Sequence, residues 1–331
     1  MNVAVIGAGS WGTATTVQLA LNGHEVVLWA RRPELAQRIA ESGCNEEYLP
    51  GVTLPKTAKI TSNIGTALRE AEAIVLAVPS KAVRTLCEQV KPYYDAQTPL
   101  VLLSKGVENE SGLLLLDVVD AVLANGSSAA VLSGPNHAEE VARGMLSATV
   151  VASATPEIAL LFQELFASES FRVYTSPDTV GVQLCGAAKN VIALAAGMLA
   201  GSGYGDNTAA MLMTRGLAEI SRLVEALGGE SQTCMGLAGM GDLIVTCASK
   251  HSRNRAFGLA LATGQTLEQY EQQTHMVVEG ALACRTIPRL ALQYGIETPI
   301  SSCVYDIVWG KRPLDDMITA LIERPFKPEF Y

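Results

Sequence analysis

At 331 residues the chain is long for a single hydrophobic core, so we expect two domains. Its hydrophobic content of 49% with 17% charged residues is typical of a globular protein, and a net charge of −9 argues against a general binder of nucleic acids or membrane surfaces. Seven cysteines lie without the spacing of a zinc site, which predicts free thiols in a reducing cytoplasm. The sequence indicates no metal centre and no secretion signal.

The first element is a continuously apolar strand over residues 2–6, as expected for the centre of a parallel sheet. It leads into Gly7-Ala8-Gly9-Ser10-Trp11-Gly12, a helix over residues 13–22 and a second strand over residues 25–30. A GxGxxG pattern between a strand and a helix predicts a dinucleotide site. Gly7 would allow the tight turn, Gly9 the approach of a pyrophosphate, and Gly12 the close packing of helix on strand. A glycine-rich turn without a ligand is the weaker alternative.

The end of the second strand bears on the choice of cofactor. A carboxylate that would hold the ribose hydroxyl of NAD is missing there, and Arg31 and Arg32 stand in its place. Because guanidinium groups bind phosphates well, we expect NADPH to be preferred, with NADH accepted, and Arg31 to be the better candidate of the two. The alternative is that these arginines are only the solvated entrance to a helix before Pro33.

Further buried strands are predicted over residues 73–78, 100–103 and 129–132, with closing strands over 147–152 and 171–174. Ser80 is expected to cap a helix that ends near residue 90. Lys105 and the Gly134–Ala138 turn follow strand ends, where ligands bind in doubly wound sheets. The pattern predicts a Rossmann-like, doubly wound parallel sheet over residues 1–176 and an all-α domain over residues 177–331.

An apolar helix over residues 178–203 contains one cation, Lys189. Gly186 and Gly197 would leave room beside it, and apolar surroundings disfavour an ammonium charge, which predicts a lowered pKa and a chemical role. The alternative is a lysine that reaches solvent along its flexible stem. A transmembrane reading is disfavoured because Lys189, Asn190 and Gln183 lie within the segment.

Polar groups also gather in two later segments. Asp242 and Thr246 are four residues apart after a glycine-rich run, so they would share one face of a helix. Ser252 is a candidate N-cap, and Arg253 and Asn254 would then occupy the first helical turn, where a phosphate binds well. An ordinary capped helix with exposed arginines is the alternative.

These motifs together resemble the soluble, bacterial NAD(P)-dependent glycerol-3-phosphate dehydrogenases. The match rests on GAGSWGTA, SKGVE, SGPNHAEE, GAAKNVIA, GSGYGDN, GMGDL and HSRNR, in the family's order and spanning residues 1 to about 308. The resemblance implies a C-terminal domain of the 6-phosphogluconate-dehydrogenase type. It also implies reversible reduction of dihydroxyacetone phosphate to sn-glycerol 3-phosphate for phospholipid synthesis, by a homodimer. Asn136 departs from the family, which usually has a hydroxyl residue at this position.

The resemblance and the residue chemistry together assign roles. Lys189 would donate and accept the proton, Lys105 would stabilise the developing oxyanion, and Asp242 would orient Lys189 or a substrate hydroxyl. The expected cofactor contacts are Gly7, Gly9, Ser10, Trp11, Gly12, Arg31, Arg32, Tyr48, Lys105, Ala138, Arg253, Val277 and Glu279. The expected substrate contacts are Lys105, Gly134, Asn136, Lys189, Asn190, Asp242, Thr246, Ser252, Arg253 and Asn254.

Two other functions remain compatible with the sequence at this point. A related dehydrogenase with a Rossmann domain and a helical domain could act on a hydroxy acid or sugar acid instead. A protein that binds NADP and reports redox state without turnover would need the Lys105, Lys189 and Asp242 set to be accidental.

Overall fold

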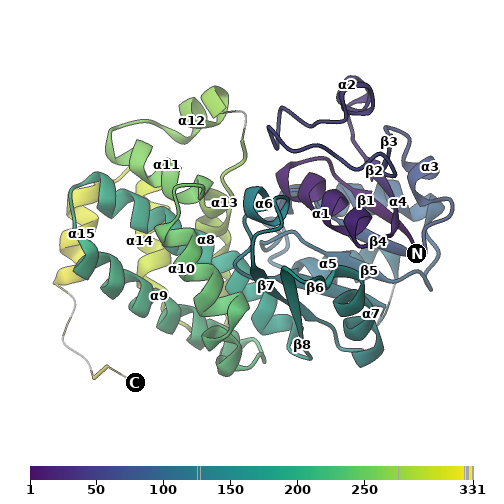
Figure 1. Cartoon of the computed structure of the whole chain (residues 1–331). Helices are drawn as coiled ribbons and strands as arrows, with labels where there is room; N and C mark the ends of the chain where they lie inside the picture. Colours follow the sequence, from purple (N-terminus) through teal and green to yellow (C-terminus); the bar gives the residue numbers. More distant parts are fainter. Residues whose placement is uncertain (125, 127, 275, 324, 326–327, 330–331) are drawn as a thin grey trace.

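The structure is a computed structural model that describes residues 1–331 except 125, 127, 275, 324, 326–327 and 330–331 (Figure 1). An eight-stranded sheet occupies the N-terminal half, in the spatial order β3-β2-β1-β4-β5-β6-β7-β8. The strands are β1 (Asn2–Ile6), β2 (Glu25–Trp29), β3 (Lys59–Thr61), β4 (Ala73–Leu76), β5 (Leu100–Leu102), β6 (Ala129–Ser133), β7 (Ser147–Ala152) and β8 (Phe171–Ser176).

Strand direction changes once across the sheet. Strands β1 to β6 pair in parallel, whereas β7 pairs antiparallel with β6 and parallel with β8. The Rossmann-like fold is confirmed, but the expected all-parallel sheet does not extend to its last two strands. Apolar runs predict a strand without its direction. The connection between β6 and β7 contains only the four-residue helix α6 (Ala138–Val141), whereas parallel crossovers usually contain a longer helix. The edge strand β3 was not predicted, because none of its residues is buried.

Alternating side chains of the central strands enter two cores, one on each face of the sheet. Val3 and Val5 of β1 pack into one core, and Ala4 and Ile6 pack into the other. The helices of this half are α1 (Ser10–Leu21), α2 (Pro33–Ser42), α3 (Ile64–Leu68), α4 (Val83–Val90), α5 (Leu115–Leu123), α6 and α7 (Pro156–Phe166). Because both faces are covered, the carboxyl edge of the sheet is left for a ligand.

From Thr179 onward the described residues form helices and no strand. These are α8 (Thr179–Gly201), α9 (Asp206–Ala226), α10 (Asp242–Ala248), α11 (Arg253–Ala262), α12 (Leu267–Thr274), α13 (Glu279–Gln293), α14 (Pro299–Val308) and α15 (Leu314–Ile322). Short helical turns are η1 (Ser80–Ala82), η2 (Lys91–Tyr93), η3 (Ser231–Met235) and η4 (Leu237–Gly241). The change from sheet to helices near residue 176 is where we place the domain division, which stays a prediction.

Helix α8 is the central element of this half and is surrounded by α9, α10, α11 and α13 (Figure 1). It is long and apolar enough to cross a membrane by length and composition, yet 83% of its most apolar window is buried inside the protein. A Cβ on Gly197 would lie 2.1 Å from the carbonyl oxygen of Arg255, and one on Gly258 would lie 2.1 Å from that of Leu194. Gly197 therefore serves close packing of α8 on α11, and the expectation that it leaves room beside Lys189 is wrong.

Candidate active site

The glycine turn after β1 has the geometry of a phosphate cradle. Gly7 has a φ of +123°, and a Cβ on Gly12 would lie 1.8 Å from the carbonyl oxygen of Gly7. In contrast, a Cβ on Gly9 would meet no atom within 4 Å, so open space lies in front of this residue. Helix α1 begins at the next residue and offers unpaired N–H groups there, and a pyrophosphate fits this position.

A loop from the α2 side braces this turn. The hydroxyl of Ser10 donates to the carbonyl oxygen of Tyr48 at 2.7 Å, and Trp11 packs half-buried against the neighbouring core. Asn45 is fully buried and donates through Nδ2 to the carbonyl oxygen of Ala8 at 3.0 Å and to Oγ1 of Thr13 at 2.7 Å. Sequence reasoning missed Asn45, because an isolated asparagine in a loop carries no local signal of this contact.

The two arginines after β2 differ in their surroundings. Arg32 forms an ion pair with Glu47 and lies 5.9 Å from the centroid of the Tyr48 ring. Arg31 is exposed, and no ion pair or hydrogen bond of its side chain occurs within the described part of the chain. The Arg31 guanidinium could therefore bind a phosphate beside β2 without first breaking an ion pair with a carboxylate.

Two lysines and one aspartate meet where the sheet edge contacts the helices. Lys189 on α8 donates through Nζ to Oδ1 of Asp242 at 2.5 Å, and Lys105 after β5 donates to Oδ2 of the same carboxylate at 2.5 Å. Lys105 also donates to the carbonyl oxygen of Gly134 at 3.1 Å. The three residues that the sequence proposes as catalytic are thus joined by one carboxylate, although Lys105 and Asp242 are 137 positions apart.

Burial determines the electrostatics of this centre. It lowers the pKa of Lys189 to about 8; the Asp242 carboxylate pulls this pKa upward and the Lys105 charge pushes it further down. Burial disfavours ionised Asp242, but the two ammonium groups outweigh it and hold the pKa of this carboxyl below its ordinary value. Lys189 is only 5% exposed, so the alternative of a lysine reaching solvent is wrong.

A tight turn places Asp242 at the start of α10. Residues of η4 form a single π-helical turn, and a Cβ on Gly239 would lie 2.2 Å from the carbonyl oxygen of Cys234, so only glycine fits there. One turn into α10, the Thr246 hydroxyl donates to the carbonyl oxygen of Asp242 at 2.6 Å and accepts from Nζ of Lys189 at 2.6 Å. The shared face expected from the spacing of Asp242 and Thr246 is confirmed.

Beside Lys189, two amides connect three helices. Nδ2 of Asn254 donates to Oδ1 of Asn190 at 2.8 Å, and Oδ1 of Asn254 accepts from the backbone N–H of Gly280 at 2.9 Å. Ser252 caps α11 by accepting from the N–H of Arg255 at 3.2 Å, so its hydroxyl serves the helix as predicted. Arg253 is exposed at the first position of α11.

The turn after β6 contains polar atoms without partners. Asn136 donates through Nδ2 to the carbonyl oxygen of Ala148 at 2.9 Å, whereas its buried Oδ1 has no partner among the described residues. Nε2 of His137 is likewise buried and unpaired in this part of the chain, and burial and the nearby Lys189 charge lower the pKa of His137. A buried polar atom without a hydrogen-bond partner has a free-energy cost, which a polar ligand bound at this turn would remove. Ala138 is buried at the start of α6.

Glu279 contacts the sheet domain from the start of α13. Its two carboxylate oxygens accept from the backbone N–H of Ser80 at 3.0 Å and from the Ser80 hydroxyl at 2.5 Å. Burial raises the pKa of Glu279, while these hydrogen bonds oppose the rise. The prediction that Ser80 caps the following helix is wrong, because its side chain is engaged by a residue 199 positions away. Val277, two residues before Glu279, is half-buried.

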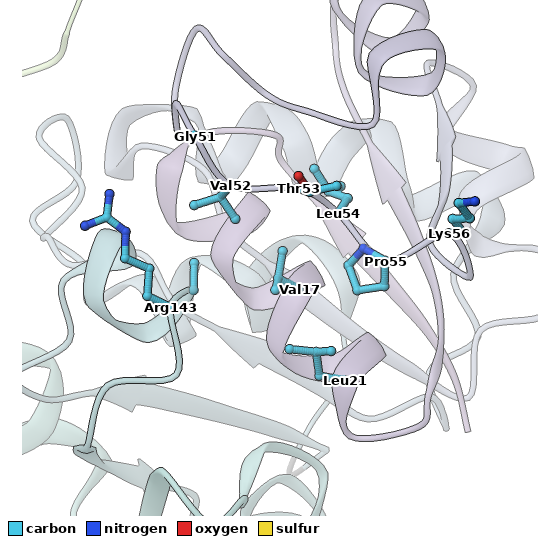
Figure 2. A pocket seen from close by; sticks show the side chains of 10 residues that line it. Val17, Leu21, Gly51, Val52, Thr53, Leu54, Pro55, Lys56 and Arg143 are labelled. Atoms are coloured by element: carbon cyan, nitrogen blue, oxygen red, sulfur yellow. The ribbon is translucent and has the colours of Figure 1, made fainter.

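The described hydrogen bonds and ion pairs do not join every candidate to the charged centre. Among these residues, none links Arg31, Val277 or the Asn136 side chain to it. A hollow of about 470 Å³ lies elsewhere, where the loop from Gly51 to Lys56 faces α1 and Arg143 (Figure 2). Figure 2 shows Arg143 and Lys56 at its opposite ends, with Val17 and Leu21 between them. It contains no predicted site residue, so the candidate site is defined by buried charges rather than by this hollow.

Two family models match the chain. The model described as the NAD-dependent glycerol-3-phosphate dehydrogenase N-terminus matches residues 2–159, and the model of the C-terminus of the same family matches residues 178–319. The two matches together span both halves of the fold.

Individual relatives agree with these matches. A glycerol-3-phosphate dehydrogenase, NAD(P)+, from Moorella thermoacetica is 49% identical over 324 residues, which cover 98% of this chain and 96% of the relative. One from Syntrophomonas wolfei is 45% identical, and the match covers 99% of this chain and 96% of the relative. The crystal structure of glycerol-3-phosphate dehydrogenase from Coxiella burnetii matches with a TM-score of 0.93 at 36% identity. The match covers 98% of this chain and 99% of that structure. The chain therefore belongs to the NAD-dependent glycerol-3-phosphate dehydrogenase family.

Proposed function

We propose that the protein catalyses reversible reduction of dihydroxyacetone phosphate to sn-glycerol 3-phosphate, with NADPH preferred and NADH accepted. The observation that supports this most directly is the Lys105–Asp242–Lys189 centre at the carboxyl edge of the sheet, with a phosphate cradle on the same edge. Two cations around one buried carboxylate suit a ketone that becomes negatively charged during reduction.

The catalytic step uses a proton held on Nζ of Lys189. Bound NADPH would be the source of the hydride for the carbonyl carbon. Lys189 donates its proton to the carbonyl oxygen, so that an N–H bond breaks and an O–H bond forms, and the lysine becomes neutral. Lys105 stabilises negative charge on this oxygen, and Asp242 and Thr246 hold the Lys189 amine in place. In the oxidation direction the neutral amine takes the proton back.

The substrate phosphate is assigned to the start of α11. Arg253 and the Asn254 amide lie in its first turn, and Ser252 fixes that turn by capping it. Gly134, Asn136, Asn190 and Thr246 would line the remaining polar wall. Since Nδ2 of Asn136 is already used by Ala148, its Oδ1 is free to accept from a substrate hydroxyl.

The cofactor is assigned along the sheet edge. Gly7, Gly9 and Gly12 would hold the pyrophosphate, and Arg31 would contact the 2′-phosphate, with Arg32 placed by Glu47. Ser10, Trp11, Tyr48, Lys105, Ala138, Arg253, Val277 and Glu279 complete the proposed contacts.

We further infer a cytoplasmic protein that acts as a homodimer, binds no nucleic acid and supplies the glycerol backbone of phospholipids. The free thiols support a cytoplasmic location, and the net negative charge supports the absence of nucleic-acid binding. Exposed apolar side chains on the helical half, among them Met211 and Met235, support self-association.

The test of this function is NADPH oxidation, followed by absorbance, with dihydroxyacetone phosphate and with unphosphorylated hydroxy and sugar acids. Only the phosphorylated ketone is expected to be reduced. Lys189→Ala should lower kcat by about 100-fold or more, as expected when a general acid is lost. A near-normal kcat in this variant would assign the proton transfer to another group.

A further inference from the structure

A bidentate contact joins the cofactor edge of the sheet to the helical half. Ser80 is buried at the start of η1, which follows β4, and its N–H and hydroxyl donate to the two oxygens of Glu279 at 3.0 and 2.5 Å. Gly106 lies against it, because a Cβ there would come within 2.4 Å of the Ser80 Cβ. The contact thus sits next to the loop that carries Lys105.

Hydrogen bonds continue from this contact to the residue beside Lys189. The N–H of Gly280, which follows Glu279, donates to Oδ1 of Asn254 at 2.9 Å. Nδ2 of Asn254 donates to Oδ1 of Asn190 at 2.8 Å, and Nδ2 of Asn190 donates to the carbonyl oxygen of Gly186 at 3.2 Å. A Cβ on Gly280 would lie 2.5 Å from the carbonyl oxygen of Asn190, so the start of α13 presses directly on α8.

The two ends of this series determine the orientation of both amides. A backbone N–H can only donate and a carbonyl oxygen can only accept, so Asn254 must turn Oδ1 toward Gly280 and Asn190 must turn Nδ2 toward Gly186. Each amide keeps one further N–H for a ligand. The position of Gly280 therefore decides where the amide donors beside Lys189 point.

Glu279 sets the position of Gly280, and Ser80 holds Glu279. Glu279 is only partly exposed, and its carboxylate would keep the Ser80 N–H but lose the hydroxyl donor if Ser80 were replaced by alanine. A shift of this carboxylate toward another donor would displace the first turn of α13.

We propose that Ser80 is a positioning residue that orients the substrate-facing amides of Asn190 and Asn254 through Glu279 and Gly280. Among the described residues, Ser80 itself forms no hydrogen bond with either amide. The proposal rests on the proposed function, because the substrate that these amides meet is taken to be dihydroxyacetone phosphate.

The experiment is a double-mutant cycle on NADPH-dependent reduction of dihydroxyacetone phosphate by the full-length enzyme, with kcat and KM measured separately. Ser80→Ala should lower kcat/KM by about tenfold, mainly through KM for the ketone, as expected for loss of one hydrogen bond to a charged group. Asn254→Ala should lower it by more. Because both act through one amide, the double variant should lie within about twofold of Asn254→Ala.

Ser104→Ala is the matched control. Its buried hydroxyl lies after the neighbouring strand β5 and donates to the carbonyl oxygen of Val78 at 2.5 Å, and among the described residues it forms no hydrogen bond with Glu279. The effects of Ser104→Ala and Asn254→Ala should therefore multiply. If thermal unfolding shows that Ser80→Ala is not folded, Ser80→Cys, which keeps the size of the side chain but is a weaker donor, replaces it in the same cycle, with the same expectation.

The outcomes separate this proposal from the function. A folded wild-type enzyme that does not reduce dihydroxyacetone phosphate overturns the proposed function and this role with it. An active wild type with an unchanged kcat/KM in Ser80→Ala, or with effects of Ser80→Ala and Asn254→Ala that multiply, overturns the role of Ser80 alone.

Discussion

The pKa of Lys189 depends on its burial and on two neighbouring charges, the Asp242 carboxylate and the Lys105 ammonium. Burial brings its pKa to about 8, and Asp242 and Lys105 act on it in opposite directions. Without Asp242 the Lys189 ammonium would lose the counter-charge that stabilises it. Without Lys105 the pKa of Lys189 would be higher, because a repelling positive charge would be removed. The centre therefore supports proton transfer in both directions near neutral pH.

The pH dependence of turnover follows from this pKa. Reduction needs protonated Lys189, so kcat should be constant below about pH 8 and fall tenfold per unit above it. Oxidation of glycerol 3-phosphate needs the neutral amine, so its kcat should rise with pH and level off above about pH 8. Steady-state kcat measured across pH in both directions checks this.

Two variants give this prediction an internal control. Asp242→Asn removes the charge that raises the pKa of Lys189, so the midpoint should move to lower pH. Lys105→Met removes the charge that lowers it, so the midpoint should move to higher pH. Midpoints that moved in the same direction would show that another group titrates.

Arg31 is expected to decide between the two cofactors. Arg31→Ala should raise KM for NADPH by about tenfold, as for a lost charged hydrogen bond, and leave KM for NADH within about twofold. Arg38→Ala is the matched control, since its guanidinium pairs with Glu47 on the same surface. Initial rates with both cofactors provide the measurement, and an equal rise for NADH would place the 2′-phosphate elsewhere.

At the level of elements, the crossing of α8 and α11 determines where the proposed phosphate site lies. Gly197 and Gly258 bring the two backbones together, and the first turn of α11 carries Arg253 and Asn254 past Asn190. Helices with larger side chains at this contact would stand farther apart. The distance between the phosphate site and Lys189 is thus a property of helix packing.

Gly258→Ala tests this packing. The new Cβ would lie 2.1 Å from the carbonyl oxygen of Leu194, so we expect a loss of about 1–3 kcal/mol in the free energy of unfolding, as for an overpacked core. Urea denaturation gives the value. Gly205→Ala, whose Cβ would meet no atom within 4 Å, should cost less than about 1 kcal/mol. Equal losses in the two variants would contradict the close approach of α8 and α11.

At the scale of the whole molecule, the helical half exposes large apolar side chains, whose contact with water does not stabilise a monomer. Tyr204, Met211, Met235 and Ile244 are between 42% and 62% exposed. In the homodimer that we propose, side chains of this kind would be buried against the partner. Light scattering after gel filtration should therefore give twice the chain mass of 35.0 kDa. A mass of one chain at micromolar concentration would refute the homodimer.

Much of the site could be predicted because its residues stand out locally. Lys189 is the one cation of an apolar helix, Asp242 follows a glycine run, and Lys105 follows a strand end. Each signal lies within a few neighbouring residues. Asn45 could not be found in this way, because nothing near it in the chain distinguishes it from an ordinary polar residue. The sequence predicts Ser80 only as a helix cap, and its contact with Glu279 has no local signal.

The sequence by itself determined the elements and their chemistry: the period of apolar residues sets strands and helices, and glycines mark the turns that backbone geometry requires. Only the tertiary structure decided which distant residues meet, namely Lys105 with Asp242 and Ser80 with Glu279, and which way β7 and β8 run. The physical reason is that hydrophobic periodicity is a local property of the chain. A contact across 137 or 199 positions depends on how whole elements pack against one another.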